Sequence, residues 1–143
     1  MERDIFVSKD SRVLGNLGPD ANGDRRDPCR REIKSWGIAT SVFTNKDTHV
    51  SVAEILSGGK SSVHRHIKFD NILCVISGQI RVDTDKDRYF LSRGESVRIP
   101  SGLLHSFFAE QDSVVAEVYV PPGTMGGAEF KDIHRVIGPS EGN

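Results

Sequence analysis

With 143 residues, 36% of them hydrophobic and 27% charged, the chain is long enough for one globular domain and too short for two full ones. Its 19 Lys and Arg against 20 Asp and Glu leave a net charge of −1, so no long-range field directs it to nucleic acid or to an anionic membrane. No stretch approaches the roughly 18 apolar residues of a membrane span and the start lacks a signal-peptide pattern, so we expect a cytoplasmic protein.

The first 35 residues are predicted to form an N-terminal arm. Residues 15–24 concentrate Gly, Asn, Asp and Pro, which favour loops, and residues 24–32 carry mixed charges. The interleaved acids neutralise the arginines of this second stretch, so a solvated loop is favoured over a phosphate-binding patch. The two cysteines, Cys29 and Cys74, lack the spacing of a zinc site and are predicted to be free thiols.

From Trp36 onward, short apolar segments alternate with Gly, Asp, Ser and Pro, and β-branched residues occupy many of the apolar positions. This pattern predicts strands at residues 38–44, 49–56, 61–66, 71–77, 79–83, 88–91, 96–99, 104–109, 114–120 and 133–137. No window offers an amphipathic helix of about ten or more residues, so a parallel α/β sheet is excluded. The sequence therefore predicts an all-β jelly-roll barrel, a double-stranded β-helix, over residues 36–138, with a short tail at 139–143.

The most informative part of the sequence is a pair of histidines with a third one further along the chain. Alternate residues of a strand point to the same face, so the side chains of His64 and His66 are expected to project side by side. A later Pro100-x-Gly102 turn ends one strand and delivers His105 at the start of the next. A His-x-His pair with a remote third histidine is a ligand set that suits a divalent metal ion.

These two blocks resemble the two sequence motifs of the cupin superfamily. The residues that match the first motif in register are Gly58, His64, His66 and Gly78. The residues that match the second motif are Gly94, Pro100, Gly102 and His105. The resemblance implies a small jelly roll whose inward-facing histidines hold a divalent metal at the mouth of the barrel, commonly in a homodimer.

Position 71 departs from the first motif, because the glutamate that usually completes the metal site is Asn71 here. The neutral carbonyl oxygen of Asn71 is a weaker ligand than a carboxylate for Zn, Fe, Ni or Mn, and the neighbouring Asp70 is expected on the opposite strand face. We therefore expect a metal bound by three histidines, with Asn71 nearby. These ligands would leave the positive charge of the metal uncompensated, which favours an anionic substrate. The alternative is a cupin without metal that keeps its histidines as hydrogen-bond donors.

A weaker resemblance, over residues 34–138, points to the cupin domain of type II mannose-6-phosphate isomerases. Ser35-Trp36-Gly37 matches their Pro-Trp-Gly opening, and Asp132-Ile133-His134-Arg135 matches an Asp-Ile-x-Arg segment near their end. Those domains normally have Gln in place of His64 and Glu in place of Asn71, so the match is incomplete. The resemblance implies a ligand such as a sugar phosphate and an isomerisation that moves a proton between adjacent carbons.

Candidates for catalysis lie on the strand predicted at residues 114–120. If Val115, Glu117 and Tyr119 share its inner face, Glu117 is a candidate base and Tyr119 is a candidate substrate-binding residue. With the opposite alternation Glu117 is a solvated surface residue, and the pattern leaves both possibilities open. Candidates for substrate binding elsewhere in the chain are Lys68, Arg98 and Phe107.

Two further functions stay open at this point. A dioxygenase would use the three motif histidines as Fe(II) ligands, and a non-catalytic module would hold a small ligand at the barrel mouth. The remaining histidines, His49 and His134, are interpreted as surface residues. Open sheet edges, together with the segment Ile5-Phe6-Val7, which is suited to pair with a neighbouring sheet, favour a homodimer.

Overall fold

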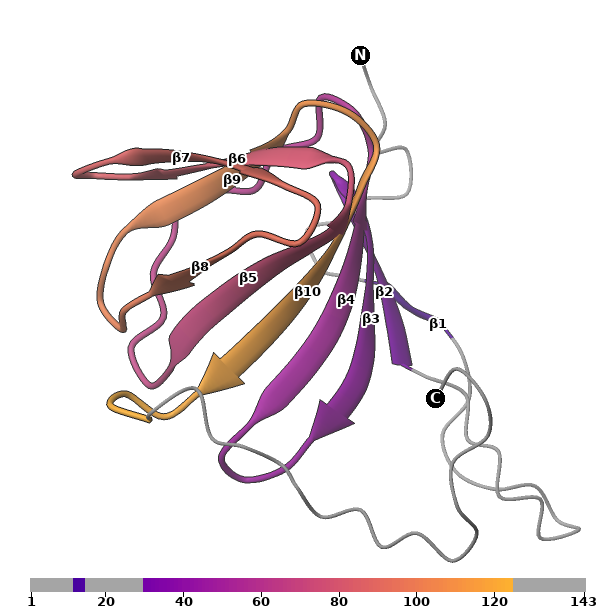
Figure 1. Ribbon diagram of the computed structural model, residues 1–143. Coiled ribbons are helices and arrows are strands. Elements are labelled where there is room, and N and C mark those ends of the chain that lie inside the picture. Colours follow the sequence, from indigo (N-terminus) through magenta and orange to yellow (C-terminus); the bar gives the residue numbers. More distant parts are fainter. Residues whose placement is uncertain (1–11, 15–29, 125–143) are drawn as a thin grey trace, which may run out of the picture.

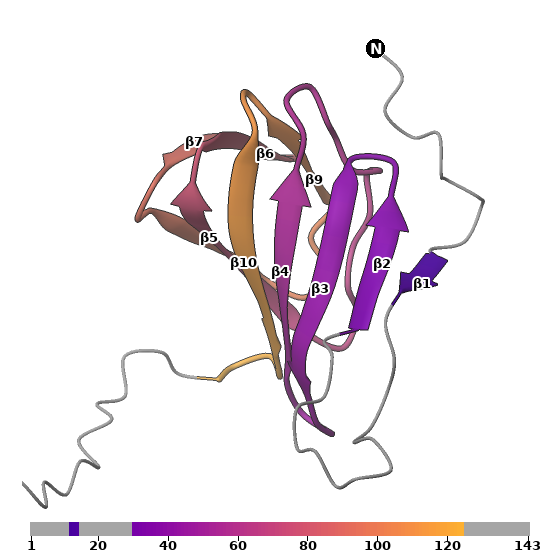
Figure 2. The same cartoon turned by 90° about the vertical axis from the view of Figure 1, so that its right-hand side faces the viewer.

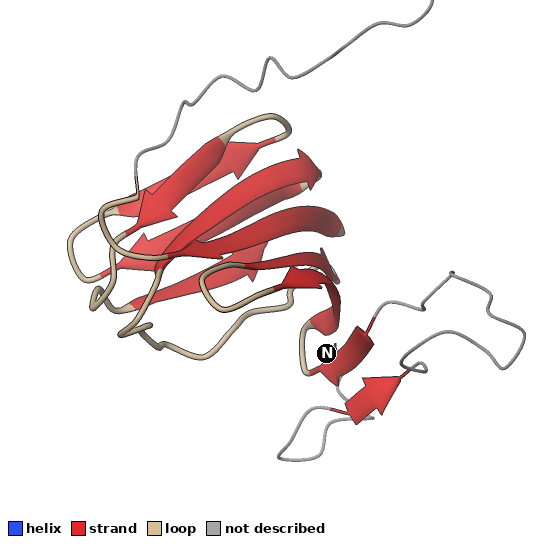
Figure 3. Cartoon of the chain, turned by 90° about the horizontal axis from the view of Figure 1, so that it is seen from below, coloured by secondary structure: helices blue, strands red, loops and turns tan. Residues whose placement is uncertain are grey.

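The computed structural model describes residues 12–14 and 30–124, and this part of the chain is all-β (Figure 1). Figure 3 shows strands and loops over these residues, and none of them forms a helix long and apolar enough to cross a membrane. The strands are β1 (Arg12–Leu14), β2 (Arg30–Lys34), β3 (Gly37–Thr44), β4 (His49–Ile55), β5 (Asp70–Ser77), β6 (Gln79–Thr84), β7 (Arg88–Ser92), β8 (Ser96–Ile99), β9 (His105–Ala109) and β10 (Ser113–Val120).

The strands form two antiparallel sheets that enclose the interior of the molecule (Figures 1 and 2). One sheet has seven strands in the order β1-β2-β3-β4-β10-β5-β8, and the other has three in the order β7-β6-β9. In the large sheet β10 pairs with both β4 and β5, so the last described strand is inserted between two earlier ones. This arrangement confirms the predicted fold class, a jelly roll.

Side-chain alternation gives the inner face of the large sheet an apolar end and a polar end. Ala53 and Ile55 on β4, Leu73 on β5 and Val115 on β10 are buried in the apolar core. The same faces continue into polar residues, and the register places these polar ends side by side, because Tyr119 pairs with His49 on β4 and with Asn71 on β5. The remaining buried core residues are Trp36, Val75, Ile80, Val82, Leu91, Ile99, Phe107 and Ala109.

The predicted strand at residues 61–66 is wrong. Around that segment the chain meets β9 only at isolated bridges, Lys60 with Phe108 just before it and His64 with His105 within it, and does not form a continuous ladder. The segment interpreted as an arm supplies two strands, since β2 pairs with β3 across the turn at Ser35 and Trp36, and β1 pairs with β2. The predicted strand at 133–137 and the tail at 139–143 lie outside the described residues.

Gly78 allows the chain to pass from the large sheet into the small one. It lies between β5 and β6 with φ of +89°, a conformation that other residues rarely adopt. A Cβ atom at this position would collide with the backbone of Asp112 and with the side chain of Ser113, which precede and begin β10. Only glycine fits this crossing without displacing the start of β10.

Candidate metal centre

Three histidines meet at the polar end of the interior. His64 and His105 are held together by two backbone hydrogen bonds, from His64 N to His105 O (2.9 Å) and from His105 N to His64 O (2.8 Å). Their rings lie 4.5 Å apart between centroids, and the ring of His66 lies 5.0 Å from that of His64 and 5.3 Å from that of His105. The candidate ligand atoms of the three residues all lie within 4.8 Å of one another, close enough to hold one metal ion.

Backbone carbonyls fix how two of these imidazoles are oriented. The Nδ1 of His64 lies 2.8 Å from Ser62 O, and the Nδ1 of His105 lies 2.9 Å from Leu103 O. Because a carbonyl only accepts, each Nδ1 carries the proton and donates it, and each Nε2 keeps a lone pair. The Nε2 atoms of His66 and His105 are buried with no hydrogen-bond partner among the described residues, as expected of atoms that would bind a metal.

The protonation state of the histidines also suits metal binding. Burial, reinforced by the neighbouring His64 and His105, lowers the pKa of His66 to about 4. Burial likewise lowers the pKa of His105, although its bond to Leu103 O acts in the opposite direction. At neutral pH these two imidazoles are therefore uncharged, which is the form that coordinates metals.

Asn71 and Asp70, adjacent at the start of β5, point to different surroundings. Asn71 is only 2% exposed on the inner face, and its Nδ2 has no hydrogen-bond partner among the described residues. Asp70 binds Arg98, with Oδ2 2.8 Å from Nη2, and its Oδ1 accepts a hydrogen bond from Ser101 N at 2.8 Å. The Ser101 amide and Arg98 lower the pKa of Asp70 against the opposing effect of burial. Asp70 therefore does not join the histidines.

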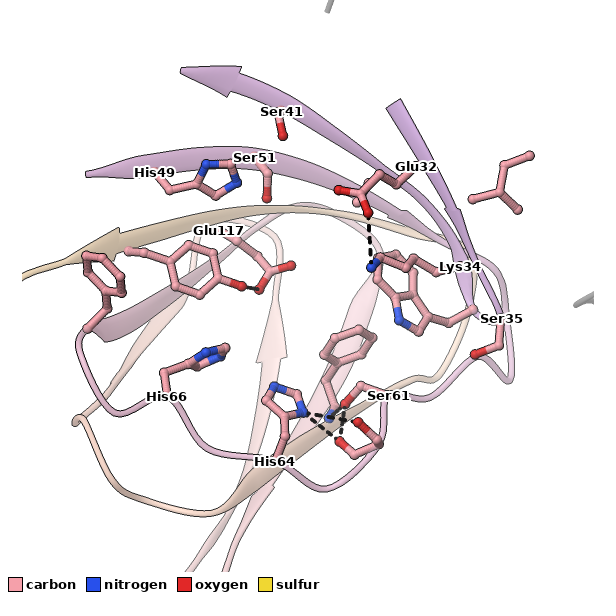
Figure 4. Close-up of a pocket in the computed structure, with 17 residues that line it drawn as sticks. Glu32, Lys34, Ser35, Ser41, His49, Ser51, Ser61, His64, His66 and Glu117 are labelled. Atoms are coloured by element: carbon pink, nitrogen blue, oxygen red, sulfur yellow. Dashed lines mark hydrogen bonds and ion pairs between the residues drawn. The ribbon is translucent and has the colours of Figure 1, made fainter. Parts of the chain in front are cut away.

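The alternation of β10, open in the sequence, places Val115, Glu117 and Tyr119 on the inner face. The Tyr119 hydroxyl donates to Glu117 Oε2 at 3.0 Å (Figure 4). Burial raises the pKa of Glu117, and the hydrogen bond from the Tyr119 hydroxyl opposes this shift only in part. Burial and the charge of Glu117 raise the pKa of Tyr119, so Tyr119 remains a phenol that donates.

A pocket of about 620 Å³ opens beside the histidines and is lined by His64, His66, Glu117 and Tyr119 among others (Figure 4). Trp36 and Phe107 form an apolar wall, with ring centroids 5.2 Å apart and planes at 75°. On the β2 side, Lys34 Nζ lies 3.5 Å from Glu32 Oε2. The serines that line the pocket are Ser35, Ser41, Ser51, Ser61 and Ser62.

A family model for the cupin domain matches residues 51–122, the segment that holds all three histidines. The chain belongs to the cupin superfamily. This family assignment agrees with the resemblance of the two histidine motifs, and the three clustered histidines agree with a metal site of the kind expected there.

Solved structures share the cupin fold at low sequence identity. KdgF from Halomonas sp. is 23% identical with a TM-score of 0.53, covering 74% of this chain and 94% of that chain. An RmlC-like cupin from Shewanella frigidimarina is 17% identical with a TM-score of 0.55 (60% and 77% covered), and the Cnp3 cupin domain of Schizosaccharomyces pombe is 13% identical with a TM-score of 0.55 (80% and 89%). These similarities concern the fold alone. Among curated protein sequences there is no significant match.

The substrate-binding candidates lie in different places in this cupin. Phe107 lines the pocket, as predicted. Arg98 does not, because Val97 and Ile99 of β8 turn toward the core and the guanidinium between them binds Asp70 on the other face. Lys68 is exposed in the loop before β5 and does not line the pocket either. Neither Arg98 nor Lys68 lines this pocket, and their part in substrate binding stays a prediction.

His49 is a pocket residue of this cupin that the sequence analysis missed. It begins β4, its Nδ1 lies 2.6 Å from Thr44 Oγ1, and its ring lies 5.6 Å from that of Tyr119. The interpretation of His49 as a surface residue is wrong, because it shares the inner face with Ser51 and Ala53 and lines the pocket. The alternation of side chains along β4 was the sequence signal that could have placed His49 in the pocket. His134 lies outside the described residues.

Proposed function

We propose that this cupin is a metal-dependent enzyme acting on a small oxygen-rich ligand, and that it interconverts the aldose and ketose forms of a sugar phosphate. The observation that carries the proposal is that a buried carboxyl, Glu117, lines the same pocket as His64 and His66, which cluster with His105. An acid–base group beside a Lewis-acid site is the combination that proton transfer next to a carbonyl requires.

The residues divide the work between binding and proton transfer. A divalent metal held by His64, His66 and His105 would polarise the carbonyl and hydroxyl oxygens of the sugar. Glu117 takes the proton from one carbon and returns it to the next, and burial raises its pKa, which makes it a stronger base. Because Tyr119 donates to Oε2, Oε1 is the atom that receives the proton.

The lining of the pocket supports a carbohydrate as the ligand. Several serine hydroxyls can exchange hydrogen bonds with the hydroxyls of a sugar, and the Trp36 and Phe107 rings offer an apolar surface to its carbon skeleton. Lys34 on the β2 side contributes a positive charge that suits an anionic group, although Glu32 lies beside it.

The proposal is tested by metal analysis of protein purified without chelator, followed by a screen of aldose and ketose phosphates. We expect bound Zn, Ni or Mn and a turnover that falls by about 10²-fold or more in Glu117→Gln, the range typical of a lost general base. Glu54→Gln, which alters an exposed carboxylate outside the pocket, is the control and should keep the wild-type rate. Absence of turnover on every sugar phosphate in the metal-loaded protein would overturn the isomerase proposal.

One observation favours a second candidate, an Fe(II) dioxygenase. The converging ligands among the described residues are three neutral histidines without a carboxylate, a set that leaves positions open for oxygen and substrate. The same purification separates the two proposals, since iron together with ligand-dependent oxygen uptake selects the dioxygenase. Protein that retains no metal and still binds a small ligand is a non-catalytic module.

A further inference from the structure

The candidate metal centre has an unbalanced charge. Three neutral histidines leave both positive charges of a divalent ion uncompensated, and the amide of Asn71 adds none. The nearby Asp70 is already engaged by Arg98 and by Ser101 N on the other face of β5. Among the described residues, the carboxyls that line the pocket beside the histidines are those of Glu117 and Glu32, and Glu32 is paired with Lys34.

Contacts lead from the histidines to Glu117 through one side chain. The ring of Tyr119 packs edge-on against that of His66 at 5.0 Å, and the hydroxyl of Tyr119 donates to Glu117 Oε2 at 3.0 Å. Glu117 itself is not in the group of converging ligand atoms. It is therefore held next to the centre without being one of its direct ligands (Figure 4).

We infer that Glu117, positioned by Tyr119, is the counter-charge of the metal centre, and that it stabilises the bound ion from β10 instead of from the ligand position occupied by Asn71. A carboxylate just outside the ligands strengthens metal binding by its charge and by fixing the groups around the ion. The inference rests on the metal-binding part of the proposed function and is independent of the isomerase reaction.

The test is the affinity of chelator-stripped protein for Zn²⁺, measured by competition with a chromophoric chelator at pH 7. We expect Glu117→Gln to weaken binding by about 10- to 100-fold, as loss of such a second carboxylate does in other centres. Tyr119→Phe, which removes the hydroxyl that holds Glu117, should weaken binding by about 2- to 10-fold, the value of one hydrogen bond. Glu54→Gln neutralises an exposed carboxylate on β4 outside this pocket and should leave the affinity unchanged.

A double variant shows whether carboxylates at positions 71 and 117 compensate the same metal charge. Asn71→Glu should raise the Zn²⁺ affinity more in the Glu117→Gln background than in the wild type, because the two carboxylates repel each other when both are present. Equal effects of Asn71→Glu in both backgrounds, or wild-type affinity in Glu117→Gln, would overturn the inference.

The outcomes also separate this inference from the proposed reaction. If Glu117→Gln loses turnover at saturating metal but binds Zn²⁺ normally, the isomerase proposal is supported and the counter-charge inference is overturned. If the Zn²⁺ affinity falls in Glu117→Gln while the wild type turns over no sugar phosphate, the counter-charge inference is supported and the isomerase proposal is overturned. Circular dichroism of each metal-stripped variant checks that it folds. If Glu117→Gln does not fold, the Zn²⁺ affinity of Tyr119→Phe is the deciding measurement. Wild-type affinity in Tyr119→Phe would then contradict the inference.

Discussion

Asn71 lies buried on the inner face of β5, beside Tyr119, and carries no charge. Asn71→Glu is expected to tighten metal binding by about tenfold or more, since a unit charge some 4 Å away contributes about 1–4 kcal/mol. The same substitution should weaken the binding of inorganic phosphate to the metal-loaded protein, because it lowers the positive charge of the site by one. Both affinities are measured by calorimetry.

Asn71→Ala is the matched control for this prediction. It removes the amide without adding charge, so metal affinity should change only slightly. If Asn71→Ala abolished metal retention while Asn71→Glu had no effect, Asn71 would be a direct ligand and the three-histidine description of the centre would be incorrect.

Asp70 makes a pH-dependent contribution to stability. Its pKa is lowered in the folded state, so its contribution is fully present above the unfolded pKa of about 3.8 and is lost as the pH falls through the lower folded value. Asp70→Asn should cost about 1–3 kcal/mol at pH 7 by breaking the bonds to Arg98 and Ser101 N. The variant should also lose less stability than the wild type on acidification below about pH 4.

Urea unfolding at a series of pH values measures both effects of Asp70→Asn. Asp85→Asn, at the exposed tip between β6 and β7, is the control and should stay within about 0.5 kcal/mol of the wild type. Parallel stability curves for Asp70→Asn and the wild type from pH 7 to pH 3 would contradict the assigned role.

The residues of the centre that follow from the sequence are those fixed by local spacing. His64 and His66 are two residues apart, and a Pro-x-Gly turn precedes His105, so their convergence is predictable from the chain itself. His49 and Lys34 reach the pocket only because β4 pairs with β10 and β2 with β3. Those pairings depend on tertiary structure, which local patterns do not specify.

At the scale of the elements, the turn between β5 and β6 offers a sharp comparison. Gly78 and Gly94 both have positive φ, +89° and +85°, but an added Cβ meets backbone at Gly78 and nothing within 4 Å at Gly94. Gly94→Ala should therefore cost only the conformational penalty of about 1–2 kcal/mol. Gly78→Ala should cost about 1–3 kcal/mol more, the usual range for overpacking.

Thermal or urea unfolding of the two glycine variants tests this difference. Equal destabilisation would show that the approach of Asp112 and Ser113 to Gly78 is not tight. The comparison needs no functional assay, so it examines the crossing between the sheets independently of the metal centre.

The strands were predictable where apolar and polar residues alternate, as in β4 and β10. The sequence pattern was misleading at two places for different reasons. Residues 61–66 carry His64 and His66 at the spacing of one strand face but meet β9 only at separated points. β2 carries Arg30, Arg31 and Glu32 at its start, a composition typical of loops. In both places the structure depends on pairing with a neighbouring strand and not on the composition of the segment itself.

For the whole molecule we expect a homodimer, because the large sheet ends in strands whose outer edges have no partner among the described residues. Val42 and Phe43, at the end of β3, are 55% and 51% exposed and add apolar surface that a second copy would cover. Light scattering at tens of micromolar protein should give twice the chain mass of 15.8 kDa. At this concentration a dimer with a dissociation constant of about 1 μM is mostly assembled. A monomer mass under these conditions would contradict the expectation.

The pair of backbone hydrogen bonds between His64 and His105 has a consequence for folding. These residues come from distant parts of the chain, so the centre does not exist until the loop between them has closed and the two sheets have met. An ion that recognises all three histidines binds the native state and not the unfolded chain, and it raises the unfolding free energy by about 2.7 kcal/mol at one hundred times its dissociation constant. The supply of such an ion would then set how stable the folded protein is.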